Sequence, residues 1–116
     1  MIESYSFGKL EYNGKLFNSD LIIMSDRVIE NWRRKEGHKL QLADLEPVID
    51  ILKIPGKSLK LIVGKGYAGL MKVDMEVDLF CQNKGIVLVK LRSARAVNEY
   101  NNSDPSTTLL VIHLTC

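Results

Sequence analysis

The spacing of apolar and polar positions changes between the two halves of this chain. In the first 40 residues, apolar side chains alternate with polar ones or gather in short runs such as Leu21-Ile22-Ile23-Met24, a pattern typical of strands. Asn13-Gly14 separates two such segments and predicts a tight hairpin turn. The N-terminal half is therefore predicted to be a meander of short strands, with a further short strand at residues 28–32.

After residue 40 the pattern predicts three helices that alternate with three strands. Asp44, Asp74 and Ser93 are expected to cap the helices, because their side-chain oxygens can accept from the first free amides. The expected strands cover residues 59–63, 86–91 and 108–115. In the second helix, Met75 and Leu79 are expected to face inward together with Phe80.

This alternation predicts a single α/β domain over residues 1–116. Successive helix and strand units imply crossover connections and a largely parallel central sheet, against which the β-rich N-terminal layer must pack. The strands are almost continuously apolar, which is typical of a sheet that is covered on both faces.

The segment that follows the strand at residues 59–63 carries three glycines, Gly64, Gly66 and Gly69, in the spacing of a dinucleotide-binding loop. Such a loop requires a helix that begins within the motif, whereas the expected cap, Asp74, comes later. It also requires an acidic residue about 20 positions on, where this chain has basic residues and Ser93. A turn at the end of a strand is therefore predicted. One alternative stays open, in which exposed loop amides beside Ser93 bind a small anion.

Composition excludes several classes of function. The net charge is +2 among 116 residues, and the only basic cluster, Arg33-Arg34-Lys35, is too short to predict nucleic-acid binding. No apolar run reaches the roughly 18 residues of a membrane span, and the N-terminus does not resemble a secretory signal. Because Cys81 and Cys116 are isolated, a reduced, cytoplasmic setting is expected.

Two histidines are the candidates for catalysis or metal binding. His113 is expected on the last strand and His38 in a loop or at a strand edge, and no nucleophile lies near either in the sequence. His38, Cys81, His113 and Cys116 are possible soft ligands, but zinc sites usually use close pairs. Residues three apart on a strand also face opposite sides, which would separate His113 from Cys116. Neither catalysis, a metal nor a cofactor is predicted.

Trp32 and Arg33 allow two interpretations. Trp and Arg often anchor interfaces, so the pair could form a partner surface. Tryptophan is also highly buried on average, which favours a role in sealing the β layer against the sheet.

The order of short motifs along the chain carries a family resemblance. The motifs are Ser6-Phe7-Gly8, Asp20-Leu21-Ile22-Ile23, Asn31-Trp32, Gly37-His38, Val63-Gly64-Lys65-Gly66, Ser93-Ala94, Tyr100-Asn101 and His113-Leu114-Thr115-Cys116. Together they resemble the family that includes respiratory complex I assembly factor 3 and the adipogenesis-associated protein with the same domain. The resemblance covers essentially the whole chain.

The resemblance implies a three-layer β+α/β/α fold around a mixed, mostly parallel central sheet, with the last strand antiparallel to the others. It also implies no established enzymatic activity or cofactor, and a role in assembly through protein contacts. Two positions depart from the family pattern: Lys65 replaces a small residue, often threonine, and Ser93 replaces threonine. Ser93 keeps the hydroxyl group, so helix capping is expected to survive.

Two functions follow as predictions. The first is a small binding or assembly module without catalytic activity, which acts on a protein partner. The alternative is a small anionic-ligand binder or enzyme that uses the pocket around Gly64–Gly69, with Gly64, Lys65, Gly66 and Ser93 as its residues. Arg33, His38 and His113 would assist only if the fold brings them there.

Overall fold

The N-terminal part of the chain forms a small antiparallel sheet. The computed structural model describes residues 1–116, and its first three strands are β1 (Ile2–Ser6), β2 (Lys9–Tyr12) and β3 (Lys15–Phe17). Asn13 and Gly14 both have positive φ at the turn between β2 and β3. This geometry confirms the hairpin predicted from the Asn-Gly pair.

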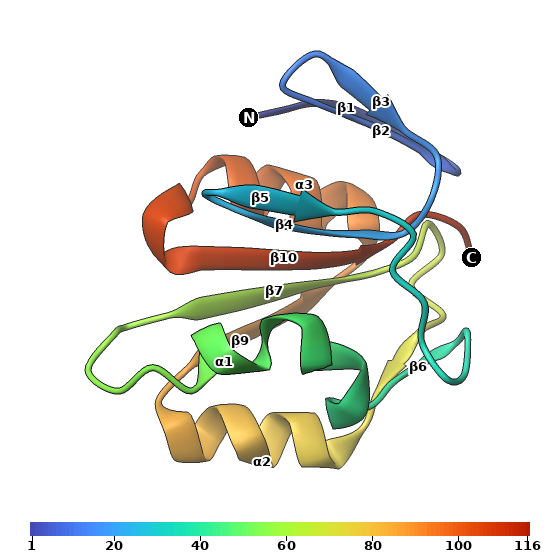
Figure 1. The fold of residues 1–116 in the computed structure, drawn as a ribbon. Helices are drawn as coiled ribbons and strands as arrows, with labels where there is room; N and C mark the ends of the chain where they lie inside the picture. Colours follow the sequence, from blue (N-terminus) through green and yellow to red (C-terminus); the bar gives the residue numbers. More distant parts are fainter.

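The central sheet has five strands in the order β5-β4-β10-β7-β9 (Figure 1). Their bounds are Leu21–Met24 for β4, Arg27–Ile29 for β5, Lys60–Lys65 for β7, Val87–Leu91 for β9 and Thr108–His113 for β10. β7 pairs in parallel with β10 and with β9, whereas β4 pairs antiparallel with β10 and with β5.

These pairings confirm a mixed α/β fold and correct two finer expectations. Parallel pairings do not predominate, because two of the four are antiparallel. The last strand is not antiparallel to the others, since β10 runs parallel to its neighbour β7. The crossover rule predicted this parallel pair correctly, and the two N-terminal strands β4 and β5 extend the sheet as an antiparallel hairpin.

Helices connect the strands of the second half. They are η1 (Leu42–Val48), α1 (Ile49–Leu52), α2 (Met75–Lys84), α3 (Ser93–Asn101) and η2 (Pro105–Thr107). A short parallel pair, β6 (Lys39–Leu40) and β8 (Lys72–Val73), forms a separate small sheet. No helix is long and apolar enough to cross a membrane.

The two faces of the central sheet are covered by different elements (Figure 1). On one face, Val111 packs with residues of η1, α1 and α2. On the other, Leu110 and Ile112 pack with α3 and with the N-terminal sheet. The alternation along β10 therefore divides the core in two, as the period of a strand requires.

Two expectations about the helices are wrong. Asp44 lies inside η1, where its carboxylate accepts the backbone N–H groups of Gln41 and Lys35. Met75 and Leu79 point to solvent on α2, while Val77 and Cys81 are buried. Val77 and Cys81 are four positions apart and share one face of the helix, so they define the inward side.

Candidate functional site

The glycines after β7 allow another part of the chain to approach closely. A Cβ atom on Gly64 would lie 2.6 Å from Cγ1 of Ile112 on the neighbouring strand. Gly66 has a φ of +101°, and a Cβ there would collide with the carbonyl groups of Thr115 and Cys116. The glycine spacing therefore lets the last residues of the chain cross the loop, which is a backbone requirement and not a nucleotide fingerprint.

Most amides of the glycine loop already have protein acceptors. The N–H groups of Gly66, Tyr67, Gly69, Leu70 and Met71 donate to Ser93 Oγ, Thr115 O, Gly66 O, Cys116 O and Lys65 O, at distances of 2.9 to 3.4 Å. Within the loop this leaves the Ala68 N–H without a protein acceptor, so an anion here would have to be held mainly by side chains.

Ser93 joins three elements at this point. It is fully buried, its hydroxyl accepts the Gly66 N–H, and it donates to the carbonyl oxygen of His113. Arg92 occupies the N-cap position of α3, so the prediction that Ser93 caps the helix is wrong. The hydroxyl instead satisfies two backbone groups that would otherwise be buried without partners.

Asp20, Arg34 and His113 form a buried polar cluster at the end of β10. Asp20 Oδ2 accepts from Arg34 Nη2 at 2.8 Å and from His113 Nδ1 at 2.7 Å, while Oδ1 accepts the Leu114 N–H at 2.7 Å. Arg34 Nη2 also donates to the carbonyl oxygen of Gly37 at 2.9 Å. The cluster thus ties the strand end to the loop that carries His38.

The hydrogen bonds assign the tautomer of His113. Arg34 Nη2 lies 3.1 Å from His113 Nδ1, but a nitrogen that donates to a carboxylate cannot also accept. In the neutral ring the proton therefore lies on Nδ1, and Nε2 carries the lone pair. Nε2 is buried without a hydrogen-bond partner, in a residue that is 6% exposed.

The charge of Asp20 is stabilised by the same contacts. Burial alone would raise the pKa of Asp20, but hydrogen bonds from His113, Leu114 and Arg34 outweigh it and hold this pKa below its ordinary value. The carboxylate is therefore ionised at neutral pH and balances the guanidinium of Arg34.

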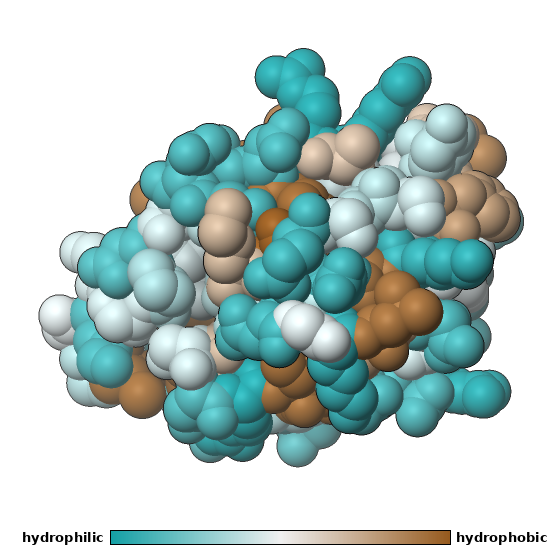
Figure 2. Space-filling model, turned by 90° about the horizontal axis from the view of Figure 1, so that it is seen from above, coloured by the Kyte–Doolittle hydropathy of each residue, from teal (hydrophilic) through white to brown (hydrophobic).

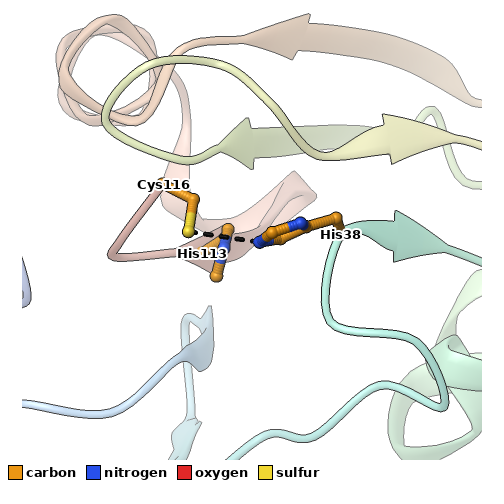
Figure 3. A group of neighbouring side chains, drawn as sticks. All are labelled: His38, His113 and Cys116. Atoms are coloured by element: carbon orange, nitrogen blue, oxygen red, sulfur yellow. Dashed lines mark hydrogen bonds between the residues drawn. The ribbon is translucent and has the colours of Figure 1, made fainter.

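His38 and Cys116 complete the cluster on its open side. Figure 3 shows His38 reaching from its loop toward Cys116 and the ring of His113. His38 Nε2 lies 3.2 Å from Cys116 Sγ, and the two imidazole ring centroids are 6.0 Å apart. His38 is exposed and Cys116 half-buried, so solvent reaches this side.

The expected separation of His113 from Cys116 is wrong. β10 ends at His113, and the chain leaves strand geometry before Cys116, so the three-residue spacing no longer places the side chains on opposite faces. Cys81, by contrast, lies buried on α2, where burial raises the pKa of its thiol to about 11.

The other predicted residues lie outside this cluster. Trp32 is buried at 4% exposure, and its indole N–H donates to Asp44 O at 2.9 Å, so it seals the core and is not available as a partner surface. Arg33 is exposed. Its neighbour Arg34 is the arginine that belongs to the polar cluster, and its guanidinium lies over the Trp32 ring. Lys65 ends β7 and is half-buried.

Asp20 and Arg34 were missed from the sequence. The sequence places Asp20 directly before an apolar strand. Whether that position brings its carboxylate to His113 depends on how the strand pairs with its neighbour. Leu21 pairs with Ile112, so the preceding residue lies opposite His113. A period of two along one strand does not specify this register.

Three exposed apolar side chains lie on or next to residues whose amides bond to residues 114–116, and we call Phe7, Tyr67 and Leu70 the apolar rim. Each is 58–59% exposed, and the rings of Phe7 and Tyr67 meet edge to face at 5.8 Å. The backbone brings them together, because Gly8, Tyr67 and Leu70 all donate to carbonyl groups of residues 114–116.

A shallow pocket of about 490 Å³ lies beside the rim. It is lined by Glu36, His38, Lys39, Leu70 and Lys72. The lining has three basic side chains and one acidic one, so the pocket carries a net positive charge.

Solved structures resemble this chain in fold. The conserved hypothetical protein PH1505 of Pyrococcus horikoshii OT3 has a TM-score of 0.76 at 23% identity, covering 100% of this chain and 99% of its own. An outer membrane protein from Bartonella henselae has a TM-score of 0.78 at 14% identity, covering 99% of this chain and 94% of its own. XCC1710 of Xanthomonas campestris has a TM-score of 0.75 at 18% identity, covering 98% of this chain and 83% of its own.

The sequence comparison gives a family. No curated protein matches the sequence significantly. A family model described as a protein of unknown function (DUF498/DUF598) matches residues 2–103. This match supports the resemblance as membership of a family whose function is unknown. It does not show the complex I assembly role that the resemblance implied. The chain therefore belongs to the DUF498/DUF598 family of proteins of unknown function.

Proposed function

We propose that this protein is a small binding module without catalytic activity, which docks a protein partner on the apolar rim. The observation that carries the proposal is the exposure of Phe7, Tyr67 and Leu70 around residues 114–116, with the rings of Phe7 and Tyr67 in contact. Aromatic side chains that stay exposed on a folded domain are typical anchors of protein interfaces.

The face over the N-terminal sheet is consistent with a small anchored contact. Figure 2 shows the face over the N-terminal sheet as mostly hydrophilic, with hydrophobic atoms in separate patches. An interface on such a protein would use a few apolar anchors within a polar surround. The proposal also includes the three-layer β+α/β/α arrangement and a reduced, cytoplasmic setting, in which the two free cysteines stay as thiols.

Affinity capture with matched variants tests this function. Phe7→Ser/Tyr67→Ser removes two anchors of the rim, while Leu16→Ser/Met75→Ser removes two other exposed apolar side chains. We expect a partner that is retained by the wild type and by the control pair, and lost by the rim pair. Equal recovery by all three proteins would count against the proposal.

A second candidate function is the binding of a small anion. It is supported by Lys39, Lys72 and His38 around the pocket beside the rim. Lys39 Nζ lies 3.8 Å from Asp74 Oδ2, which partly neutralises the lysine, and most amides of the glycine loop already donate to protein acceptors. A melting temperature that pyrophosphate leaves unchanged would remove this candidate.

A further inference from the structure

We propose that His38, His113 and Cys116 bind a zinc ion, with Asp20 as the outer partner that orients His113. One ligand atom from each of the three side chains can be chosen so that all lie within 4.8 Å of one another. The site is distinct from the apolar rim and does not depend on the proposed docking function.

The strongest support comes from the buried ring of His113. Its Nδ1–H donates to Asp20, which leaves the lone pair of Nε2 without a partner in the interior. Burial of an unpaired polar nitrogen is costly, and a ligand offsets that cost. Metal-binding histidines usually donate their other nitrogen to a carboxylate or carbonyl, as His113 does here.

The carboxylate itself is held rigidly. Arg34 Nη2 and the Leu114 N–H donate to the two oxygens of Asp20 at 2.8 and 2.7 Å. The same Arg34 nitrogen donates to Gly37 O, directly before His38. One hydrogen-bond network therefore positions two of the three ligands.

The distances are close to those of a tetrahedral site. Bonds of about 2.1 Å to nitrogen and about 2.3 Å to sulfur place two such ligand atoms roughly 3.6 Å apart. His38 Nε2 and Cys116 Sγ lie 3.2 Å apart, and the largest separation in the set is 4.8 Å. Closing it requires a shift of about 1 Å toward His113, which the exposed His38 and the half-buried Cys116 can make on the open side without disturbing the core.

The ligand types select the metal. Two imidazoles and a thiolate suit zinc, whereas magnesium and calcium prefer oxygen ligands. Asp20 and Arg34 balance each other, so the thiolate supplies the net negative charge next to the cation. Three protein ligands leave a fourth position of a tetrahedral site for water or another ligand.

Metal titration of the reduced full chain tests the site, with any affinity tag at the N-terminus so that Cys116 keeps its surroundings. Calorimetry with zinc chloride is expected to show one ion bound per chain, and magnesium chloride none. Cobalt(II) is expected to give the absorption band of a cobalt–thiolate bond. Cys116→Ser and His38→Ala each remove a ligand and are expected to weaken zinc binding by about tenfold to 100-fold. Asp20→Asn is expected to weaken it by about tenfold, because His113 loses the carboxylate that orients its ring.

The second cysteine provides the matched control. Cys81→Ala is expected to keep the cobalt–thiolate band and the zinc affinity, because Cys81 is buried on α2. The proposal is overturned if the wild type binds no zinc, or if Cys116→Ser binds it as tightly as Cys81→Ala. Cys116→Ser and His38→Ala both lie on the open side of the cluster, so the fold is expected to survive each change. Circular dichroism of the two variants therefore separates loss of binding from loss of the fold.

Discussion

Strand β10 passes through two different environments within six residues. Leu110, Val111 and Ile112 are fully buried among apolar side chains. His113, the next residue, is buried among charged and polar groups, and one of its ring nitrogens has no partner. The middle of β10 thus makes apolar contacts, whereas its carboxyl end carries a buried ring nitrogen that no group of the chain hydrogen-bonds. We expect the first environment to contribute most to stability, and the second supplies the histidine of the proposed zinc site.

The largest expected effect lies in the interior. Leu110→Ala removes a fully buried side chain between the central sheet and α3, and should lower the free energy of unfolding by about 3–4 kcal/mol. Leu16→Ala, at an exposed position of β3, should cost less than about 0.5 kcal/mol. Urea unfolding measures both. Similar losses for the two variants would show that the division between interior and surface is misplaced.

A smaller effect is expected at the polar edge. Asp20→Asn leaves the buried guanidinium of Arg34 without its counter-ion and should cost about 2 kcal/mol at neutral pH. Because folding lowers the pKa of Asp20, its contribution is present above its ordinary pKa of 3.8 and is lost as the pH falls through the lower folded value. The unfolding free energy of the wild type should therefore fall more steeply in acid than that of Asp20→Asn. Parallel acid profiles for the two proteins would contradict this role of Asp20.

The smallest expected effect concerns the glycine loop. Gly66→Ala and Gly14→Ala both place a side chain at positive φ, but only at Gly66 would the new Cβ meet other atoms within 4 Å. Gly66→Ala should therefore cost about 1 kcal/mol more than Gly14→Ala, because the segment at Thr115 and Cys116 must shift. Thermal unfolding provides the difference. Equal losses would mean that the closing segment does not depend on this glycine.

The elements of the fold were largely predictable, because each is signalled locally. The Asn-Gly turn and the apolar runs require only neighbouring residues to interpret. The inward face of α2 was misassigned because Met75 and Leu79 are apolar yet exposed, and composition alone does not show which apolar residues meet the core.

The polar cluster was not predictable in the same way. His113 and His38 were recognised as candidates, but Asp20 lies 93 positions from His113 and Arg34 lies 79. Their contacts depend on the antiparallel register of β4 and β10 and on the path of the chain after His113. Neither of these leaves a periodic signal in the sequence.

The position of β10 has a consequence for synthesis. β10 is the centre of the sheet and also its last strand to be made, and β4 and β7 each pair with it but not with each other. At translation rates of 5–20 residues per second, roughly 4–17 s separate the end of β4 from the start of β10. In the first part of that interval β4 alone lacks this partner, and once β7 has been made the nascent chain presents two apolar strands that both lack it. A ribosome-associated chaperone that shields them would therefore matter more for the yield of this protein than for its stability once folded.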